Sequence, residues 1–196
     1  TRRLPIVKKE VVIRRAFHCL IALAPVYYLL PVDLPVIGVR RWVVLIAFFA
    51  GIIFIEAIRL PKGILFLGMR PHEKDQVASF VWAAAGITAA LWFFPHDIAA
   101  AAIVGMAFVD PLAGELRSHG VGTWRNIGVS SLVYFVICIT ILVLANDRLL
   151  PALLVLAAIG TVIAIGSEQL KNVHLDDDFL MVCAPGLAMT ALALVL

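Results

Sequence analysis

Charged residues and cysteines are both scarce in this sequence, and their scarcity narrows the class of protein. Charged residues make up 15% of the 196 residues and apolar residues 63%, whereas the apolar share of a soluble domain is nearer one half. A soluble domain is therefore excluded, and the chain is predicted to be an integral membrane protein. The three cysteines lie in separate apolar runs without the spacing of a metal or redox pair, so they are interpreted as small core residues.

Strict alternation of apolar and polar residues is also absent, as are internal repeats. A membrane β-barrel needs such alternation in its strands, so the long continuous runs favour helices instead. The predicted fold is all-α: a polytopic membrane helix bundle with about seven transmembrane helices and an N-terminal interfacial helix, forming a single integral-membrane domain over residues 1–196. The apolar runs cover about residues 16–32, 42–58, 77–94, 98–116, 127–145, 149–166 and 179–196.

Positive charge is unevenly distributed along the chain. Six of the sixteen Lys and Arg residues fall within the first fifteen positions, among apolar residues, which predicts an interfacial helix on anionic lipid rather than a nucleic-acid arm. With a cytoplasmic N-terminus, the predicted topology places thirteen Lys and Arg residues in the cytoplasm and three outside, as the positive-inside rule requires. Ten of the thirteen acids fall on the same side, so the active face of this multi-pass protein is predicted to be cytoplasmic.

One acid, Asp110, interrupts an apolar run. The apolar residues 98–109 before it make about 18 Å of helix, whereas a bilayer core needs about 30 Å. The span is therefore expected to continue to about Leu116, which places the Asp110 carboxylate at or inside the hydrocarbon boundary. A charge there is costly unless it faces protein, water or a cation, so Asp110 is a candidate functional residue. Pro111 is expected to free the Ala107 carbonyl oxygen near this carboxylate.

Two pairs of charged residues share a helical spacing of three. Arg15 and His18 lie on one face of the first predicted helix, where an arginine at the lipid interface with a neighbouring histidine is the simpler interpretation. Glu56 and Arg59 lie at the end of the second predicted span, where a structural ion pair is favoured.

The polar loops near Asp110 hold candidate phosphate-binding residues. Arginine side chains and the backbone N–H groups of glycines bind phosphate well, although both are also common in solvated loops. Neither a Walker motif nor a GxGxxG motif is present. The candidates are Arg70, Lys74, Arg117, Gly120 and Arg125.

Acids flank the last predicted cytoplasmic loop, with Glu168 before it and Asp176, Asp177 and Asp178 after it. Three adjacent acids repel one another, so they need a stabilising partner. Mg²⁺ is one, because it binds carboxylates together with the phosphates of a substrate. An acidic cap at a helix N-terminus explains them equally well.

Taken in order, these motifs resemble the polyprenol kinase family, which comprises dolichol kinases, phytol and farnesol kinases, and CTP-dependent diacylglycerol kinases. The resemblance covers nearly the whole chain and rests on RRAFH (14–18), IEAIR (55–59), RPHEKD (70–75), VDPLAGELRSHG (109–120), RNIGVS (125–130) and SEQLKNVHLDDDF (167–179). It implies a membrane enzyme that uses Mg²⁺ to transfer the γ-phosphoryl group of CTP to a lipid alcohol. The acceptor would be diacylglycerol or a polyprenol such as dolichol, phytol or geranylgeraniol, and no nucleic acid is involved.

The resemblance also assigns residues. Asp110 would bind metal or nucleotide phosphate, and Asp176, Asp177 and Asp178 match the family's acidic run, with Asp178 where Asn is usual. Arg125 and Ser130 would stand for the Lys and the final Ser of the family motif K-[ST]-x-E-G-S. The other matched positions are Arg15, His18, Glu56, Arg59 and Glu168.

The chain departs from the family in that last motif, because Gly128 occupies the position of its Glu. Glu115, five residues beyond Asp110, is the candidate to replace that Glu as a catalytic acid. Two alternatives also stay open: a CDP-lipid synthase similar to phosphatidate cytidylyltransferases, and a non-catalytic membrane subunit of the same fold.

Overall fold

The computed structural model describes residues 9–34, 38–145, 149–170 and 175–196, and these residues form an all-α fold. Four helices, α2, α4, α5 and α6, are long and apolar enough to cross a membrane, and α3 is a shorter apolar helix. The all-α membrane bundle is therefore confirmed, while the total of seven spans stays a prediction. The helices are α1 (Lys9–Ile21), α2 (Arg41–Lys62), α3 (Ser79–Phe93), α4 (His96–Ser118), α5 (Thr123–Ala145), α6 (Leu150–Gln169) and α7 (Asp177–Ala193), with 3₁₀ turns η1 (Ala24–Leu29) and η2 (Pro71–Lys74).

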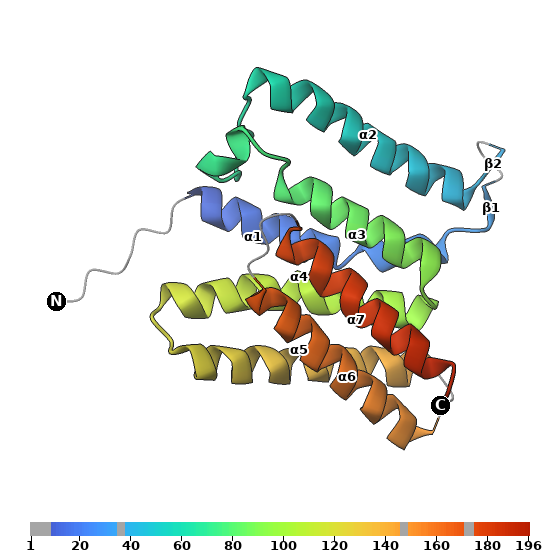
Figure 1. Ribbon diagram of the computed structural model, residues 1–196. Coiled ribbons are helices and arrows are strands. Elements are labelled where there is room, and N and C mark those ends of the chain that lie inside the picture. Colours follow the sequence, from blue (N-terminus) through green and yellow to red (C-terminus); the bar gives the residue numbers. More distant parts are fainter. Residues whose placement is uncertain (1–8, 35–37, 146–148, 171–174) are drawn as a thin grey trace.

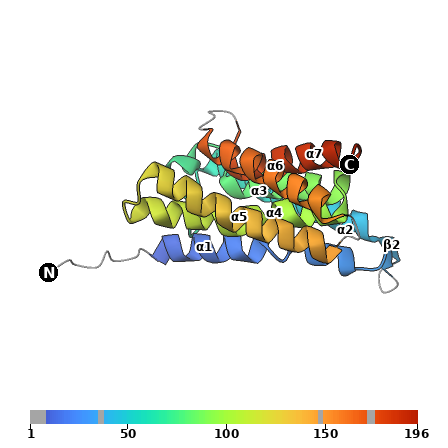
Figure 2. The same ribbon diagram turned by 90° about the horizontal axis from the view of Figure 1, so that it is seen from below.

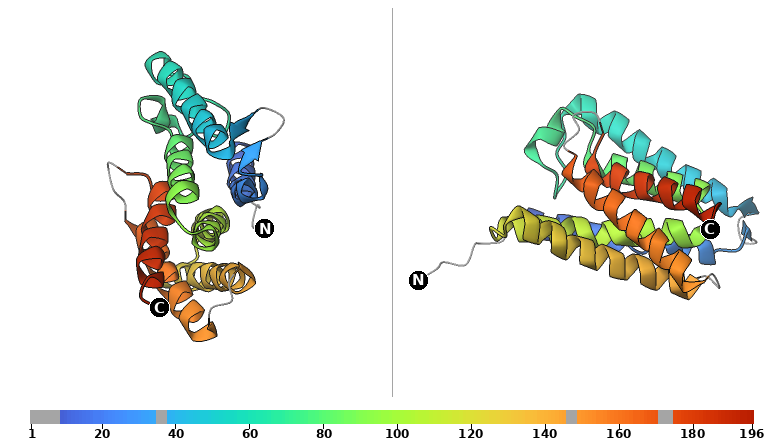
Figure 3. Two further views of the ribbon diagram at one scale, coloured as in Figure 1. Left: turned by 90° about the vertical axis from the view of Figure 1, so that its right-hand side faces the viewer. Right: turned by 60° about the horizontal axis from the view of Figure 1, so that its bottom comes forward.

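Helix α4 forms the centre of the bundle and packs against α5, α7, α1 and α3. The end-on view of Figure 3 (left) shows it enclosed by the other helices. Its first half is rich in alanine and is almost fully buried, so neighbouring backbones can approach closely. Gly105 shows how tight this packing is, since a Cβ there would lie 2.5 Å from the Tyr134 ring of α5.

The first predicted span is divided in the structure. Helix α1 ends at Ile21, and η1 follows with Pro25 in its first turn, because proline has no N–H group to continue the α-helical hydrogen bonds. Of the predicted interfacial helix, residues 1–8 lie outside the described part, and the described residues from Lys9 onward belong to α1. Figure 2 shows α1 running beside α4.

Helix α4 continues through Pro111 to Ser118, which confirms that the apolar run extends past Asp110. Asp110 thus lies inside the helix, about two turns before its end. The start of α1, the ends of α2, α4 and α6, and the starts of α3, α5 and α7 gather at one end of the bundle (Figure 1). We call this the charged end, because nearly all the candidate residues lie there and most of them are charged.

Outside the helices, the described residues contain one short hairpin. Strand β1 (Asp33–Leu34) pairs antiparallel with β2 (Val39–Arg40), with Asp33 opposite Arg40. It precedes α2 at the end of the bundle opposite the charged end (Figure 1).

Candidate active site

Three side chains that are distant in the sequence meet at the charged end. His18 comes from α1, Asp110 from α4 and Asp178 from the first turn of α7. His18 Nε2 lies 3.2 Å from Asp110 Oδ2 and 3.3 Å from Asp178 Oδ1. His18 is 7% exposed and Asp178 1% exposed, while Asp110 is partly buried. The structure therefore joins one residue from each of three sequence motifs, and we call the three the His18 cluster.

The backbone of α1 fixes how the His18 ring is turned. Its Nδ1 atom lies 3.1 Å from the carbonyl oxygen of Arg14, one helical turn earlier. A carbonyl oxygen only accepts hydrogen bonds, so Nδ1 must carry a hydrogen and donate it. Nε2 is left facing the two carboxylates, either with a second hydrogen to donate or with a lone pair to offer a cation.

The acids at residues 176–178 divide their roles. Asp176 is the N-cap of α7 and accepts a hydrogen bond from the Asp178 backbone N–H at 3.1 Å, which is the helix-cap interpretation. Asp178 is instead turned inward to His18. Burial, together with the carboxylates of Asp178 and Asp177, raises the pKa of Asp176 to about 7.

Glu73 and Ser79 connect the loop before α3 to α7. The Ser79 hydroxyl lies 2.7 Å from Glu73 Oε1 and 3.0 Å from Asp176 Oδ2. Glu73 also accepts hydrogen bonds from the backbone N–H groups of Ser79 and Arg70, at 3.0 and 2.5 Å. Burial acts to raise the pKa of Glu73, but these hydrogen bonds outweigh it and hold that pKa below its ordinary value.

A cavity of about 390 Å³ opens beside Asp110. We call it the polar cavity, because four arginine side chains line it together with the turn from Gly68 to Pro71. Of Arg70 and Lys74, which were both expected at the same mouth as Asp110, Arg70 lines this cavity and Lys74 does not. Such a cavity suits an anion with several oxygens, because guanidinium groups bind phosphate through paired N–H donors. The four are Arg14, Arg15, Arg70 and Arg117.

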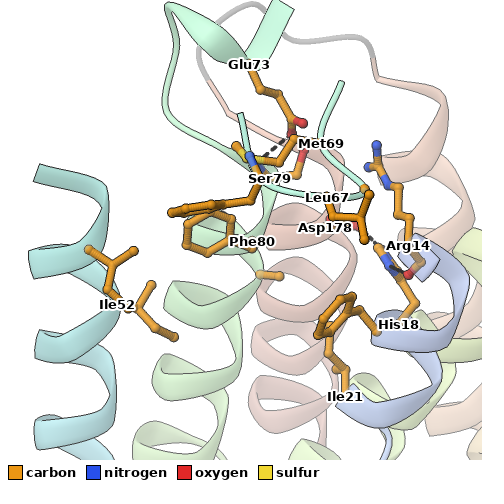
Figure 4. A pocket seen from close by; sticks show the side chains of 15 residues that line it. Arg14, His18, Ile21, Ile52, Leu67, Met69, Glu73, Ser79, Phe80 and Asp178 are labelled. Carbon is orange, nitrogen blue, oxygen red and sulfur yellow. Dashed lines mark hydrogen bonds and ion pairs between the residues drawn. The ribbon is translucent and has the colours of Figure 1, made fainter. Parts of the chain in front are cut away.

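A second cavity, of about 460 Å³, lies between α1, α2 and α3 (Figure 4). We call it the apolar cavity, since most of the residues that line it are apolar, among them Phe17, Ile52 and Phe80. His18 lines both cavities, whereas Asp110 lines only the polar cavity and Asp178 only the apolar one. The His18 cluster therefore lies where the two cavities meet.

Glu56 and Arg59 form a buried ion pair that supports the loop carrying Arg70. Arg59 is 1% exposed, and all five of its N–H groups have acceptors. The acceptors are the two carboxylate oxygens of Glu56, at 2.6 and 2.7 Å, and the carbonyl oxygens of Ile64, Glu73 and Gln76, at 3.1, 2.7 and 2.7 Å. Neither Glu56 nor Arg59 lines the polar or the apolar cavity. The pair is structural, as its spacing indicated.

Two acids hold arginines at the rim of the polar cavity. Glu115 pairs with Arg15 and also lies 3.3 Å from His119 Nδ1. Glu168, with its side chain 2% exposed, pairs with Arg117. Neither acid is among the residues that line the cavity, so the structure places Glu115 beside a phosphate-binding candidate rather than at the His18 cluster.

The residues matched to the family's K-[ST]-x-E-G-S motif lie elsewhere. Arg125 is exposed in the first turn of α5. Ser130 is buried, and its hydroxyl donates to Asn126 Oδ1 at 3.1 Å, while Asn126 donates to the Ala113 carbonyl oxygen at 3.1 Å. Neither Arg125 nor Ser130 lines the polar or the apolar cavity. The structure thus uses Ser130 in a contact between α5 and α4.

Two other phosphate-binding candidates have local roles. The side chain of Lys74 lies over Gly63 at the end of α2, where a Cβ on Gly63 would be 3.1 Å from Lys74 Cε. Gly120 follows the end of α4 with φ +72°, a backbone conformation that glycine adopts without strain. Neither residue lines the two cavities.

Sequence reasoning did not single out Arg14 or Ser79. Arg14 lines both cavities, and its spacing of four from His18 was a usable signal, because residues four apart share a helix face. Ser79 carried no such signal, since its role depends on α7 packing beside α3.

The His18 cluster fits a divalent cation. One ligand atom from each of the three residues lies within 4.8 Å of the others, and residues 176–178 form a second group of this kind. Asp178 Oδ2 is buried and has no hydrogen-bond partner in the described part of the chain. Comparisons of the chain with protein-family models, with curated proteins and with solved structures find no match.

Proposed function

We propose that the protein is a CTP-dependent lipid-alcohol kinase that transfers the γ-phosphoryl group of CTP to a polyprenol or to diacylglycerol. The observation that carries the proposal is the meeting of the polar and apolar cavities at His18. A lipid-alcohol kinase needs such a junction, because its acceptor hydroxyl must reach the nucleotide phosphates while the hydrocarbon chain stays in apolar surroundings.

The arginines of the polar cavity supply what phosphoryl transfer requires of a protein. That reaction depends on positioning and on neutralising the charge of the transferred group, with little covalent chemistry by side chains. Arg14, Arg70 and Arg117 would bind the phosphate oxygens. Mg²⁺, which the family resemblance implies, would be held by Asp110 and Asp178 and would supply further charge neutralisation.

The acceptor would lie in the apolar cavity with its hydroxyl at the His18 cluster. In the reaction, the bond from the γ-phosphorus to its bridging oxygen breaks, a bond to the lipid oxygen forms, and CDP leaves. The hydroxyl proton passes to a carboxylate. Of the two acids that line this cavity, Glu73 already accepts three hydrogen bonds. Asp178 Oδ2 has no partner among the described residues, so Asp178 is the proton acceptor in this proposal.

The test uses the purified chain in detergent with Mg²⁺, geranylgeraniol or diacylglycerol, and CTP labelled at the γ-phosphorus. Wild type should give a labelled lipid phosphate. Asp110→Asn should lower the rate by about 100-fold or more, as expected for losing a group that organises transition-state charge, while the melting temperature stays within a few degrees. Asp75→Asn, at an exposed acid of the same end, is the matched control and should keep the wild-type rate.

The products distinguish the alternatives. Transfer of the CMP part of CTP to a lipid phosphate, which gives a CDP-lipid and releases pyrophosphate, would favour the CDP-lipid synthase. Absence of turnover with every nucleotide and lipid tested would contradict the kinase proposal and favour a non-catalytic subunit.

A further inference from the structure

We infer that His18 Nε2, Asp110 Oδ2 and Asp178 Oδ1 bind one divalent ion of the first-row transition metals, and that this site prefers such an ion to Mg²⁺. The inference does not rest on the proposed phosphoryl transfer, because it concerns an ion bound in the absence of nucleotide and lipid. It replaces the Mg²⁺ that the resemblance implies at Asp110 and Asp178 with a transition-metal ion. It changes the role of His18 from a neighbour of two acids to a metal ligand.

The spacing of the three atoms suits one ion. His18 Nε2 lies 3.2 Å from Asp110 Oδ2 and 3.3 Å from Asp178 Oδ1. In an octahedral site with metal–ligand bonds of about 2.1 Å, adjacent ligand atoms are about 3 Å apart. The side chains therefore need only small adjustments to coordinate an ion between them.

The orientation of His18 is that of a metal ligand. A ligating histidine commonly donates its other ring N–H to a carbonyl oxygen or a carboxylate, which fixes its tautomer and directs the lone pair at the metal. The Nδ1 atom of His18 makes such a bond to the Arg14 carbonyl at 3.1 Å. Because that carbonyl belongs to the same helix, the ring is oriented before any ion binds.

A protonated His18 alone does not balance the charge of the two carboxylates in the cluster. With both carboxylates ionised, Asp110 and Asp178 bring two negative charges, of which a protonated His18 balances one. The arginines of the polar cavity lie on the side of Asp110, and of these four only Arg14 also lines the apolar cavity with Asp178. Asp178 is 1% exposed, and its Oδ2 has no partner among the described residues; a buried, incompletely paired carboxylate is costly. A divalent ion with a neutral imidazole brings the cluster to zero net charge.

The nitrogen ligand determines which ion is preferred. Mg²⁺ binds oxygen ligands and usually retains several waters, and Mn²⁺ also favours oxygen, whereas imidazole nitrogen suits Fe²⁺, Ni²⁺ and Zn²⁺. The all-oxygen group at residues 176–178 would suit Mg²⁺ better. However, Asp176 already caps α7 and contacts Ser79, which leaves that group fewer free oxygens.

The first measurement is the melting temperature of the purified full chain, titrated with ZnCl₂ or MgCl₂. Zn²⁺ should reach half its stabilising effect at a concentration at least tenfold lower than Mg²⁺. His18→Asn should remove this difference. His119→Asn, which makes the same change at an exposed histidine of the same end, should keep it. Equal midpoints for the two ions in wild type would overturn the inference.

The second measurement identifies the nitrogen directly and needs no variant. Pulsed EPR of the Mn²⁺-loaded wild-type protein should show modulation from ¹⁴N, and labelling histidine alone with ¹⁵N should replace it. In His18→Asn the modulation should disappear, and in His119→Asn it should remain. A Mn²⁺ signal without histidine nitrogen would refute the ligand set. Neither CTP nor lipid is present in this measurement, so a missing nitrogen signal would not contradict the kinase proposal. An enzyme without kinase activity would likewise not contradict the metal site.

Discussion

Two buried clusters of charge lie at the same end of the bundle and differ in how completely they are paired. In the pair formed by Glu56 and Arg59, every N–H group of the arginine has an acceptor. In the His18 cluster, two carboxylates face one ring nitrogen, and Asp178 Oδ2 has no partner among the described residues. The first cluster has all its hydrogen-bond partners without a ligand, whereas the second leaves one carboxylate oxygen without a partner among the described residues.

How completely a buried cluster is paired distinguishes a structural cluster from a binding site more clearly than burial or charge alone. A complete network stabilises one arrangement of the chain, since removing any member leaves the others buried and unpaired. An incomplete network next to a cavity keeps binding capacity for a ligand. The Arg59 pair holds the loop that carries Arg70 into the polar cavity, so the complete network positions part of the incomplete one.

The largest effect on stability is expected from Arg59→Met. It leaves the Glu56 carboxylate and three carbonyl oxygens without their donor, and breaking a buried pair in this way costs about 3–5 kcal/mol of unfolding free energy. Reversible unfolding of the protein in mixed micelles measures it. Asp178→Asn is the matched comparison and should change stability by less than about 1 kcal/mol, because it removes charge from a cluster that has too much. Equal losses in the two variants would contradict the distinction.

A smaller effect is expected from Glu73→Gln, and it should depend on pH. Hydrogen bonds from Ser79 and Arg70 overcome the effect of burial and lower the pKa of Glu73. A carboxyl group with a lowered pKa stabilises the fold above its ordinary pKa, and this contribution is lost as the pH falls through the lowered value. At pH 7 the variant should be less stable by about 1–3 kcal/mol.

Melting curves between about pH 3 and pH 7 follow the difference between wild type and Glu73→Gln, which should shrink below about pH 4. Asp75→Asn, at an exposed acid two residues away, should show no such trend. A difference between wild type and Glu73→Gln that is constant with pH would mean that the glutamine loses packing rather than charge.

Much of the fold could be predicted from hydropathy, because continuous apolar runs longer than a strand form helices in any membrane. Hydropathy did not show the break in the first run, but Pro25 indicated a kink there, and η1 packs against α4 after it. Hydropathy also did not show that α1 runs without interruption from Lys9 to Ile21, past the end predicted for the interfacial helix.

The candidate site was predictable residue by residue but not as an assembly. Asp110 stood out because an acid in an apolar run needs a reason, and residues 176–178 stood out because adjacent acids repel. Their common partner His18 became evident only when α1, α4 and α7 were packed together. The Ser130 hydroxyl donates to Asn126 and lines neither cavity, so a role of Ser130 in binding nucleotide stays a prediction.

The smallest effect is expected at Glu115, the residue proposed to replace the acid missing at Gly128. Its carboxylate faces Arg15 and His119 at the rim and does not line either cavity. Partly exposed ion pairs at a surface contribute about 1 kcal/mol or less, so Glu115→Gln should change the rate of CTP-dependent prenol phosphorylation by less than about threefold. A catalytic acid would instead lose about 100-fold or more. Gly128→Glu supplies the comparison, because a Cβ atom there meets no atom within 4 Å. If Glu115→Gln abolished turnover and Gly128→Glu restored it in the double variant, Glu115 would join the His18 cluster in the chemistry, and incomplete pairing would no longer be sufficient to identify the site.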